Sequence, residues 1–174
     1  MRHCSLPESE RMSPTSRKVW LTTHVVCSVG WLGAVATSLA LAVVAAAADS
    51  ATTSRSAYIT LEAVGWWVVV PLSVASLLTG TLQSLITSWG LVRHYWIIAK
   101  LLINVVSIVI LLLYMQTLGH LADQARAFTE TGSDPSPIVH AGVALGLLVI
   151  ATLLSVLKPR GLTKRGARFV ARSS

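Results

Sequence analysis

The stretch from Arg93 to Met115, RHYWIIAKLLINVVSIVILLLYM, decides the fold class of this chain. After Lys100 it contains no charged residue, and it is long enough to cross a bilayer, which takes about 20 residues of helix. Plain apolar side chains would cross more cheaply than Lys100 and Asn104, which lie one helical turn apart. The stretch therefore predicts a transmembrane helix with two polar groups that need partners.

The composition of the whole chain extends this prediction. Of its 174 residues, 53% are hydrophobic and only 12% are charged, and the mean hydropathy is +0.68. These values leave too few polar groups to cover a soluble globule. Four long windows are almost free of charge and are near or above the length of a membrane span. We predict an all-α bundle of four transmembrane helices, with spans at about 19–48, 61–86, 95–119 and 138–157.

The distribution of Lys and Arg predicts the orientation in the membrane. Eleven of the 14 lie before the first span, between the second and third spans, or after the fourth span, and only two lie in the other connections. Because cationic segments stay on the cytoplasmic side, we expect both termini inside. We expect a flexible cytoplasmic segment at 1–17, a membrane domain at 18–158 and a basic cytoplasmic tail at 159–174. The tail begins at the membrane surface, so its expected partner is anionic lipid headgroups and not nucleic acid.

Small residues recur at intervals of four in three of the spans. They are Gly30, Ala34 and Ser38; Ser76, Gly80 and Ser84; and Gly142 and Gly146. Such spacing lets helix backbones approach closely in lipid, and short connections favour an up-down-up-down bundle. We also expect a short polar turn at 49–57, a kink at Pro71, and a third helix that continues through Phe128 and ends at Gly132.

Polar side chains within the spans fall into two clusters by depth. At the cytoplasmic end lie His24, Gln83, Lys100 and Asn104. At the outer end lie Glu62, Tyr114, His120 and His140. The inner four can share one helical turn of depth, which makes them the candidate site. They also have a structural interpretation, because Lys100 can extend to the headgroups and the other three can hydrogen-bond between helices.

Two motifs carry a resemblance to known membrane proteins. They are THVVCSVGWLGAVAT at 23–37 and WGLVRHYWIIAKLLINVVSIVILLL at 89–113. Over most of residues 18–157 the chain resembles small uncharacterised integral membrane proteins of actinobacteria, which implies a bacterial cytoplasmic membrane and no particular activity. More distantly it resembles the membrane domain of copper-resistance-D proteins and the HemJ-type protoporphyrinogen oxidases. The shared features are His24 with its following Trp-Gly stretch, and Lys100 one turn into a span.

The distant resemblance implies a bound b-type haem. It makes His24 the ligand of the haem iron and Lys100 a partner for a propionate or a substrate carboxylate. The chain departs from the oxidases because no second histidine lies at the depth of His24 in another span. Three functions stay open: a structural or accessory subunit that binds itself or another membrane protein, a b-haem redox protein, and a transporter or metal-handling protein. We favour the first, which needs no catalysis by this chain.

Overall fold

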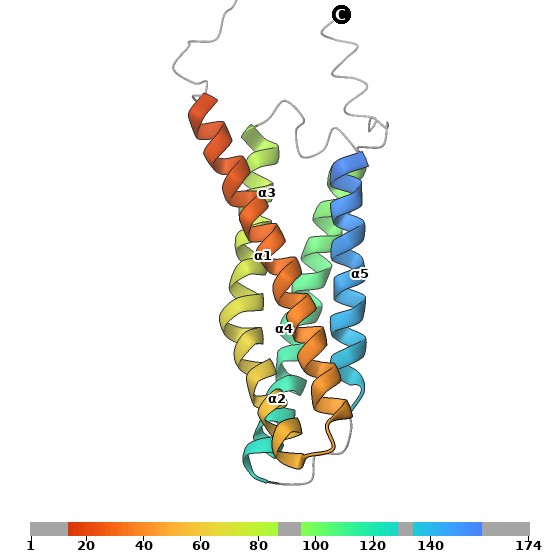
Figure 1. Cartoon of the computed structure of the whole chain (residues 1–174). Coiled ribbons are helices and arrows are strands. Elements are labelled where there is room, and N and C mark those ends of the chain that lie inside the picture. The colour runs from red at the N-terminus through yellow and green to blue at the C-terminus, as the bar shows by residue number, and fades with distance from the viewer. Residues whose placement is uncertain (1–13, 87–94, 129–133, 158–174) are drawn as a thin grey trace, which may run out of the picture.

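The computed structural model describes residues 14–86, 95–128 and 134–157, which form an antiparallel bundle of helices (Figure 1). Four stretches are long and apolar enough to cross a membrane, namely Thr15–Ala47, Ala51–Leu85, Ile97–Arg126 and Ser136–Leu157. Within the described residues there is no strand. The predicted all-α bundle of four spans is therefore confirmed, and its helices are those of a multi-pass membrane protein.

The helices follow one another around the bundle. They are α1 (Pro14–Ala47), α2 (Ala51–Val64), α3 (Val70–Ile86), α4 (Tyr95–Arg126) and α5 (Ser136–Leu157). A five-residue π-helical turn, η2 (Gly65–Val69), joins α2 and α3 into one span. Helix α1 contacts α2, α3 and α5, and α4 contacts the same three helices. Helices α1 and α4 therefore lie diagonally across the bundle, as an up-down-up-down arrangement requires.

The start of α1 and the end of α5 lie at the same end of the bundle (Figure 1). We call this the inner end, following the predicted orientation, and we call the opposite end the outer end. Towards the inner end, α1 stays with α3 while α4 stays with α5, and the two pairs separate (Figure 1).

The second span begins earlier than the sequence predicted. In place of a polar turn at 49–57, helix α2 begins at Ala51. The Ser54 hydroxyl donates to the Ala45 carbonyl at 2.7 Å, so this polar side chain finds its partner on the preceding helix. Tyr58 is buried against the outer end of α4, and burial of such a large side chain favours a helix here over a solvated turn.

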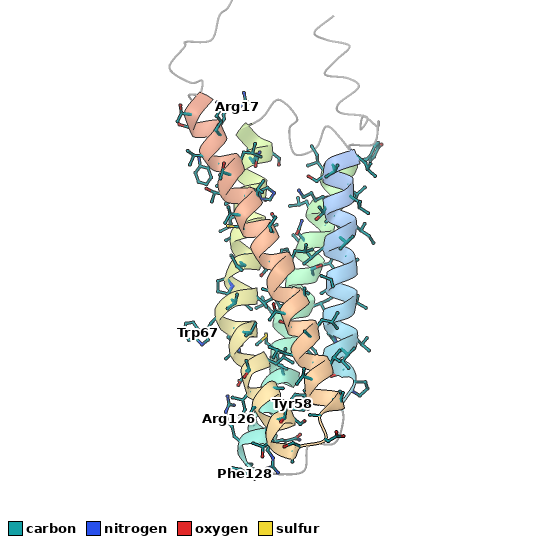
Figure 2. All side chains as sticks on the ribbon, viewed as in Figure 1. Arg17, Tyr58, Trp67, Arg126 and Phe128 are labelled. Atoms are coloured by element: carbon teal, nitrogen blue, oxygen red, sulfur yellow. The ribbon has the colours of Figure 1, made fainter. Side chains whose placement is uncertain are left out.

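A wide helical turn precedes Pro71, where the sequence predicted a kink. The N–H of Val70 donates to the Gly65 carbonyl, five residues back, so η2 is wider than an α-helix. A proline lacks the N–H for the regular ladder, and its ring clashes with the carbonyl four residues earlier. The wide turn therefore lies where proline disturbs the helix. Within it, Trp67 is 81% exposed and points away from the bundle (Figure 2).

Helix α4 ends at Arg126, before the predicted end at Gly132, which lies outside the described residues. Phe128 has a φ of 56°, the left-handed conformation that commonly terminates a helix. The Arg55 guanidinium donates to the Phe128 carbonyl at 3.2 Å and lies 5.0 Å from the centre of its ring. A contact with α2 thus accompanies the end of α4.

Three buried apolar layers follow one another along the bundle. The middle layer consists of Trp31, Ala34, Val35, Val69, Ile108 and Leu148. The next layer outward consists of Ala42, Leu61, Met115 and Leu118. The outermost layer consists of Ala45, Ala57, Tyr58, Leu121 and Ala125. Together these layers separate the inner polar residues from the charged residues of the outer end.

Candidate functional site

His24 is held between α1 and α3 at the inner end. Its Nδ1 lies 3.1 Å from the Thr79 hydroxyl oxygen, and its Nε2 lies 3.5 Å from the Ser28 hydroxyl. Because the Thr79 hydroxyl donates its own proton to the Ala75 carbonyl at 2.7 Å, it can only accept from His24. Nδ1 therefore carries the proton, and Nε2 is the acceptor when the ring is neutral. Ser28 also reaches Ser76 at 2.9 Å, which adds a second link to α3.

The space for the His24 ring comes from Gly80. A Cβ atom built on Gly80 would lie 2.8 Å from Cε1 of His24 and 3.3 Å from Nδ1. Real Cβ atoms do not approach other atoms so closely. The four-residue spacing predicted that Gly80 allows close packing, and the structure shows with what: its missing side chain leaves room for the His24 imidazole.

Lys100 and Asn104 belong to the other helix pair. The Lys100 ammonium donates to the Ser155 hydroxyl in α5 at 3.3 Å, and the Asn104 amide donates to the backbone carbonyl of Lys100 at 2.8 Å. Both side chains are half-buried. Gln83 is also half-buried in α3, and among the described residues its carbonyl oxygen has no hydrogen-bond partner.

The predicted inner site is therefore distributed over two helix pairs. Among the residues that the structure describes, no hydrogen bond links His24 to Gln83, Lys100 or Asn104. His24 and Lys100 each contact the neighbouring helix, and Asn104 bonds to the backbone of its own helix. Gln83 is the exception, since its carbonyl oxygen has no partner among the described residues. Of the two polar residues in the third span, Lys100 contacts α5 and Asn104 bonds to the backbone of its own helix.

The surroundings of His24 do not suit a haem in this arrangement. Iron would need Nε2 and an open apolar slot beside it, whereas Ser28 lies against Nε2 and joins α1 to Ser76 of α3. Haem ligation by His24 stays a prediction, and the visible absorption spectrum of the purified protein, oxidised and reduced, beside a His24→Ala variant would test it.

The outer cluster is divided between a charged group and an aromatic group. Arg126 of α4 pairs with Glu62 of α2 and with Asp123 one turn earlier, at the outer end of the bundle (Figure 2). The second group contains Tyr114 and His140, whose rings stack with centroids 3.8 Å apart and planes 14° apart. His120 is exposed and belongs to neither group.

Hydrogen bonds fix the aromatic group in place. The Tyr114 hydroxyl lies 3.0 Å from the Ser136 hydroxyl at the start of α5. Nδ1 of His140 lies 2.9 Å from the Ser136 carbonyl, which can only accept, so Nδ1 carries the proton. Stacking and hydrogen bonding together join α4 to the first turn of α5.

A cavity of about 300 Å³ lies in the outer half of the bundle, and sequence reasoning did not find it. Its wall is mostly apolar, with Ser38, Ser107, Tyr114 and His140 as the polar lining residues. Three other lining residues, Ile110, Val139 and Val143, are exposed, which places its mouth between α4 and α5. The sequence placed two of its lining residues, Tyr114 and His140, in the outer polar cluster but did not indicate a cavity.

Fold and side-chain contacts define a polytopic membrane protein whose polar groups mainly join its own helices. Over the described ranges, no three His, Cys, Asp or Glu side chains lie close enough together to hold a metal ion. No protein-family model, curated protein or solved structure matches the chain. The resemblances stated above therefore stay expectations, and the function is argued from the geometry.

Proposed function

We propose that this protein is an accessory membrane subunit, which packs the lipid-facing side of α5 against a transmembrane helix of a second copy or of another membrane protein. One observation carries the proposal. Gly142 and Gly146 lie one turn apart on α5, and a Cβ atom added to either would meet no atom of the described residues within 4 Å. Gly146 is exposed, as are Val139, Val149 and Leu153 on the same side of the helix.

Gly142 and Gly146 lower the stability of α5, and no contact within the described part of the chain makes use of them. Glycine in a helix interior is less favourable than alanine by about 1 kcal/mol in water. Gly80 has a clear use, because it admits His24, but the bundle places nothing against Gly142 or Gly146. Helices in lipid associate through close backbone contact at small residues spaced four apart. The pair therefore suits a partner helix that a single chain lacks.

The burial of α5 supports the same conclusion. Only 11% of its most apolar 18 residues are buried, compared with 28% in each of the first two spans. Its inward side already contacts α1 and α4, so the outward side carrying the glycines is the one that a partner can use. Such a partner would cover part of the exposed surface of α5, the span that its own bundle buries least.

The interior of the bundle favours an accessory role over transport. A continuous polar path would have to join Lys100 at the inner end to Glu62 at the outer end. Buried apolar side chains of the middle layer, among them Trp31 and Ile108, lie between these two positions.

The test uses two differently tagged copies of the full chain, expressed together and purified in mild detergent. The Gly142→Leu, Gly146→Leu double variant places large side chains where a partner helix would approach α5. Gly33→Leu is the matched control, because Gly33 is also exposed and no atom of the described residues lies near its Cβ position. We expect the wild type and the control to retain a partner in a fixed ratio by native mass spectrometry, and the double variant to lose it. Recovery of the second tag identifies self-association, and recovery of another membrane protein identifies a mixed complex.

The proposal is wrong if the wild type is a single chain both in detergent and in lipid nanodiscs. It is also wrong if the double variant keeps its partner as well as the control does. Circular dichroism of each variant checks that the helices form, since leucine at a lipid-facing position of a helix has no neighbour to displace.

A further inference from the structure

The ammonium group of Lys100 has no counter-ion within the described part of the chain. It donates to the Ser155 hydroxyl of α5 at 3.3 Å, which is a neutral partner. Both ion pairs among the described residues lie at the other end of the bundle and involve Arg126. A lysine inside a membrane span is costly, so its charge is ordinarily paired or brought to the membrane surface.

The acidic side chains of this chain lie away from Lys100. Four of the seven are at the outer end of the bundle, namely Asp49, Glu62, Asp123 and Asp134. In the sequence, Glu130 belongs to the outer connection between α4 and α5, and Glu8 and Glu10 precede α1. The connection at 87–94 and the segment after α5 contain no acidic side chain. The inner ends of α4 and α5 therefore present a positive charge to which a negative group from outside the chain can bind.

Ser155 is a second donor at the same place. Its oxygen accepts from Lys100, and its own O–H donates to no group among the described residues. Thr152, by contrast, donates to the Leu148 carbonyl, as hydroxyls in helices ordinarily do. Ser155 lies on the same side of α5 as buried Leu148 and Ala151, and both Ser155 and Lys100 are half-buried. The ammonium and the hydroxyl are thus two adjacent donors that can share one acceptor.

The depth of the two donors points to the headgroup region of the bilayer. Lys100 is five residues from Tyr95, where α4 begins, and Ser155 is two residues from Leu157, where α5 ends. These intervals correspond to about 8 Å and about 3 Å of helix. The flexible stem of lysine can carry its ammonium across such a distance. The negative groups that a membrane presents at this depth are lipid phosphates, and basic sites between span ends are known to bind them.

We propose that Lys100 and Ser155 bind the phosphate group of an anionic phospholipid at the inner ends of α4 and α5. The Lys100 ammonium and the Ser155 hydroxyl each donate to a phosphate oxygen, and Ser155 still accepts from Lys100. The acyl chains of the lipid lie along the outside of α5, where Val156 and Leu157 are exposed. The site uses the inward side of α5, so it does not rest on the glycine pair or on the proposed function.

The experiment titrates the purified full chain in neutral detergent with dioleoylphosphatidylglycerol and measures bound lipid by native mass spectrometry. Lys100→Met removes the charge at the site, and Lys18→Met is the matched control, because Lys18 is an exposed cation at the same end of the bundle. We expect Lys100→Met to weaken binding by about tenfold and Lys18→Met by less than about twofold. Lys100→Arg keeps the charge and should retain binding to within about threefold.

The hydroxyl has its own matched pair of variants. Ser155→Ala removes the second donor and should weaken lipid binding by about threefold. Thr152→Ala removes a hydroxyl one turn away that already has an acceptor, so it should change binding by less than about twofold. Circular dichroism of each variant checks that the helices form. An unchanged affinity in Ser155→Ala would overturn the placement of the phosphate between α4 and α5.

Three other results would also overturn the proposal. Equal loss of binding in Lys100→Met and Lys18→Met would reduce the effect to a general attraction between the cationic end and anionic lipid. Equal affinity of the wild type for dioleoylphosphatidylcholine would show that no net negative charge is needed. Displacement of the lipid by inorganic phosphate alone would assign the two donors to a soluble phosphate compound and not to a lipid.

Discussion

Replacing Gly80 with alanine tests the packing of His24 most directly. The added Cβ would lie 2.8 Å from Cε1 of His24, whereas ordinary contacts between carbon atoms begin near 3.5 Å, so the ring has to move by roughly 0.7 Å. The hydrogen bond from Nδ1 to Thr79 is 3.1 Å long, and such a movement away from α3 would stretch it beyond the useful range. The substitution therefore causes a steric clash and loses an interhelix contact.

The expected magnitude follows from three contributions. Overpacking a well-filled site costs about 1 to 3 kcal/mol. Loss of the hydrogen bond adds about 1 kcal/mol, and the better helix propensity of alanine returns about 1 kcal/mol. We expect Gly80→Ala to lower the free energy of unfolding by about 1 to 3 kcal/mol.

The assay is reversible unfolding in mixed micelles with increasing sodium dodecyl sulfate, followed by circular dichroism. Gly33→Ala is the control, since a Cβ atom there would meet nothing within 4 Å, and its stability should be unchanged or slightly higher. In a His24→Ala background the clash is absent, so Gly80→Ala should no longer destabilise the protein. Equal stability of Gly80→Ala and Gly33→Ala in the wild-type background would refute the packing described for His24.

Three further predictions concern the outer end and the orientation. At low salt, Glu62→Gln should lower the thermal unfolding temperature more than Asp123→Asn does, because the Glu62–Arg126 pair joins two helices whereas Asp123 and Arg126 lie on the same helix. Added salt screens both ion pairs and should remove the difference. Tyr114→Phe should lower the free energy of unfolding by about 1 kcal/mol in the same micelle assay, through loss of its hydrogen bond to α5. A membrane-impermeant thiol reagent should label Cys4 in inside-out vesicles and not in intact cells, since the positive-inside rule places the N-terminus in the cytoplasm; labelling in intact cells would reverse the orientation.

The spans and their inward faces could be predicted from the sequence because lipid imposes simple rules on length and polarity. Of the four inner side chains expected to find partners, His24 and Lys100 meet neighbouring helices, whereas Asn104 bonds to its own helix. The Gln83 carbonyl oxygen has no partner among the described residues. Which partners they find could not be predicted, because this depends on how each helix is rotated against its neighbour. Gly80 illustrates the difficulty, since its interval predicted close packing in general and not a space for an imidazole.

The cavity lay further beyond sequence reasoning. It forms where side chains from α1, α2, η2, α4 and α5 fail to fill the space between them, and such a misfit depends on five elements at once. Tyr114 and His140 were expected at the outer end, but nothing in their spacing indicates an empty space beside them, and Ser107 was not singled out. Whether the Ser107 hydroxyl has a partner depends on the positions of neighbouring atoms, which the sequence does not give.

Two of the helices are also much longer than the hydrocarbon core of a bilayer is thick. Helix α1 has 34 residues and α4 has 32, or about 50 Å each at 1.5 Å per residue, against a hydrocarbon core of about 30 Å. Arg55, Glu62 and Arg126 mark the outer ends of α2 and α4 as the portion that meets water and headgroups. There the burial of Tyr58 gains from the exclusion of water, whereas His24 and Gly80 act through close fit alone. The outer end is thus stabilised partly by the hydrophobic effect and the inner end by close packing. Urea should therefore unfold the outer end first, whereas a change of detergent or lipid should first change the stability of the inner end.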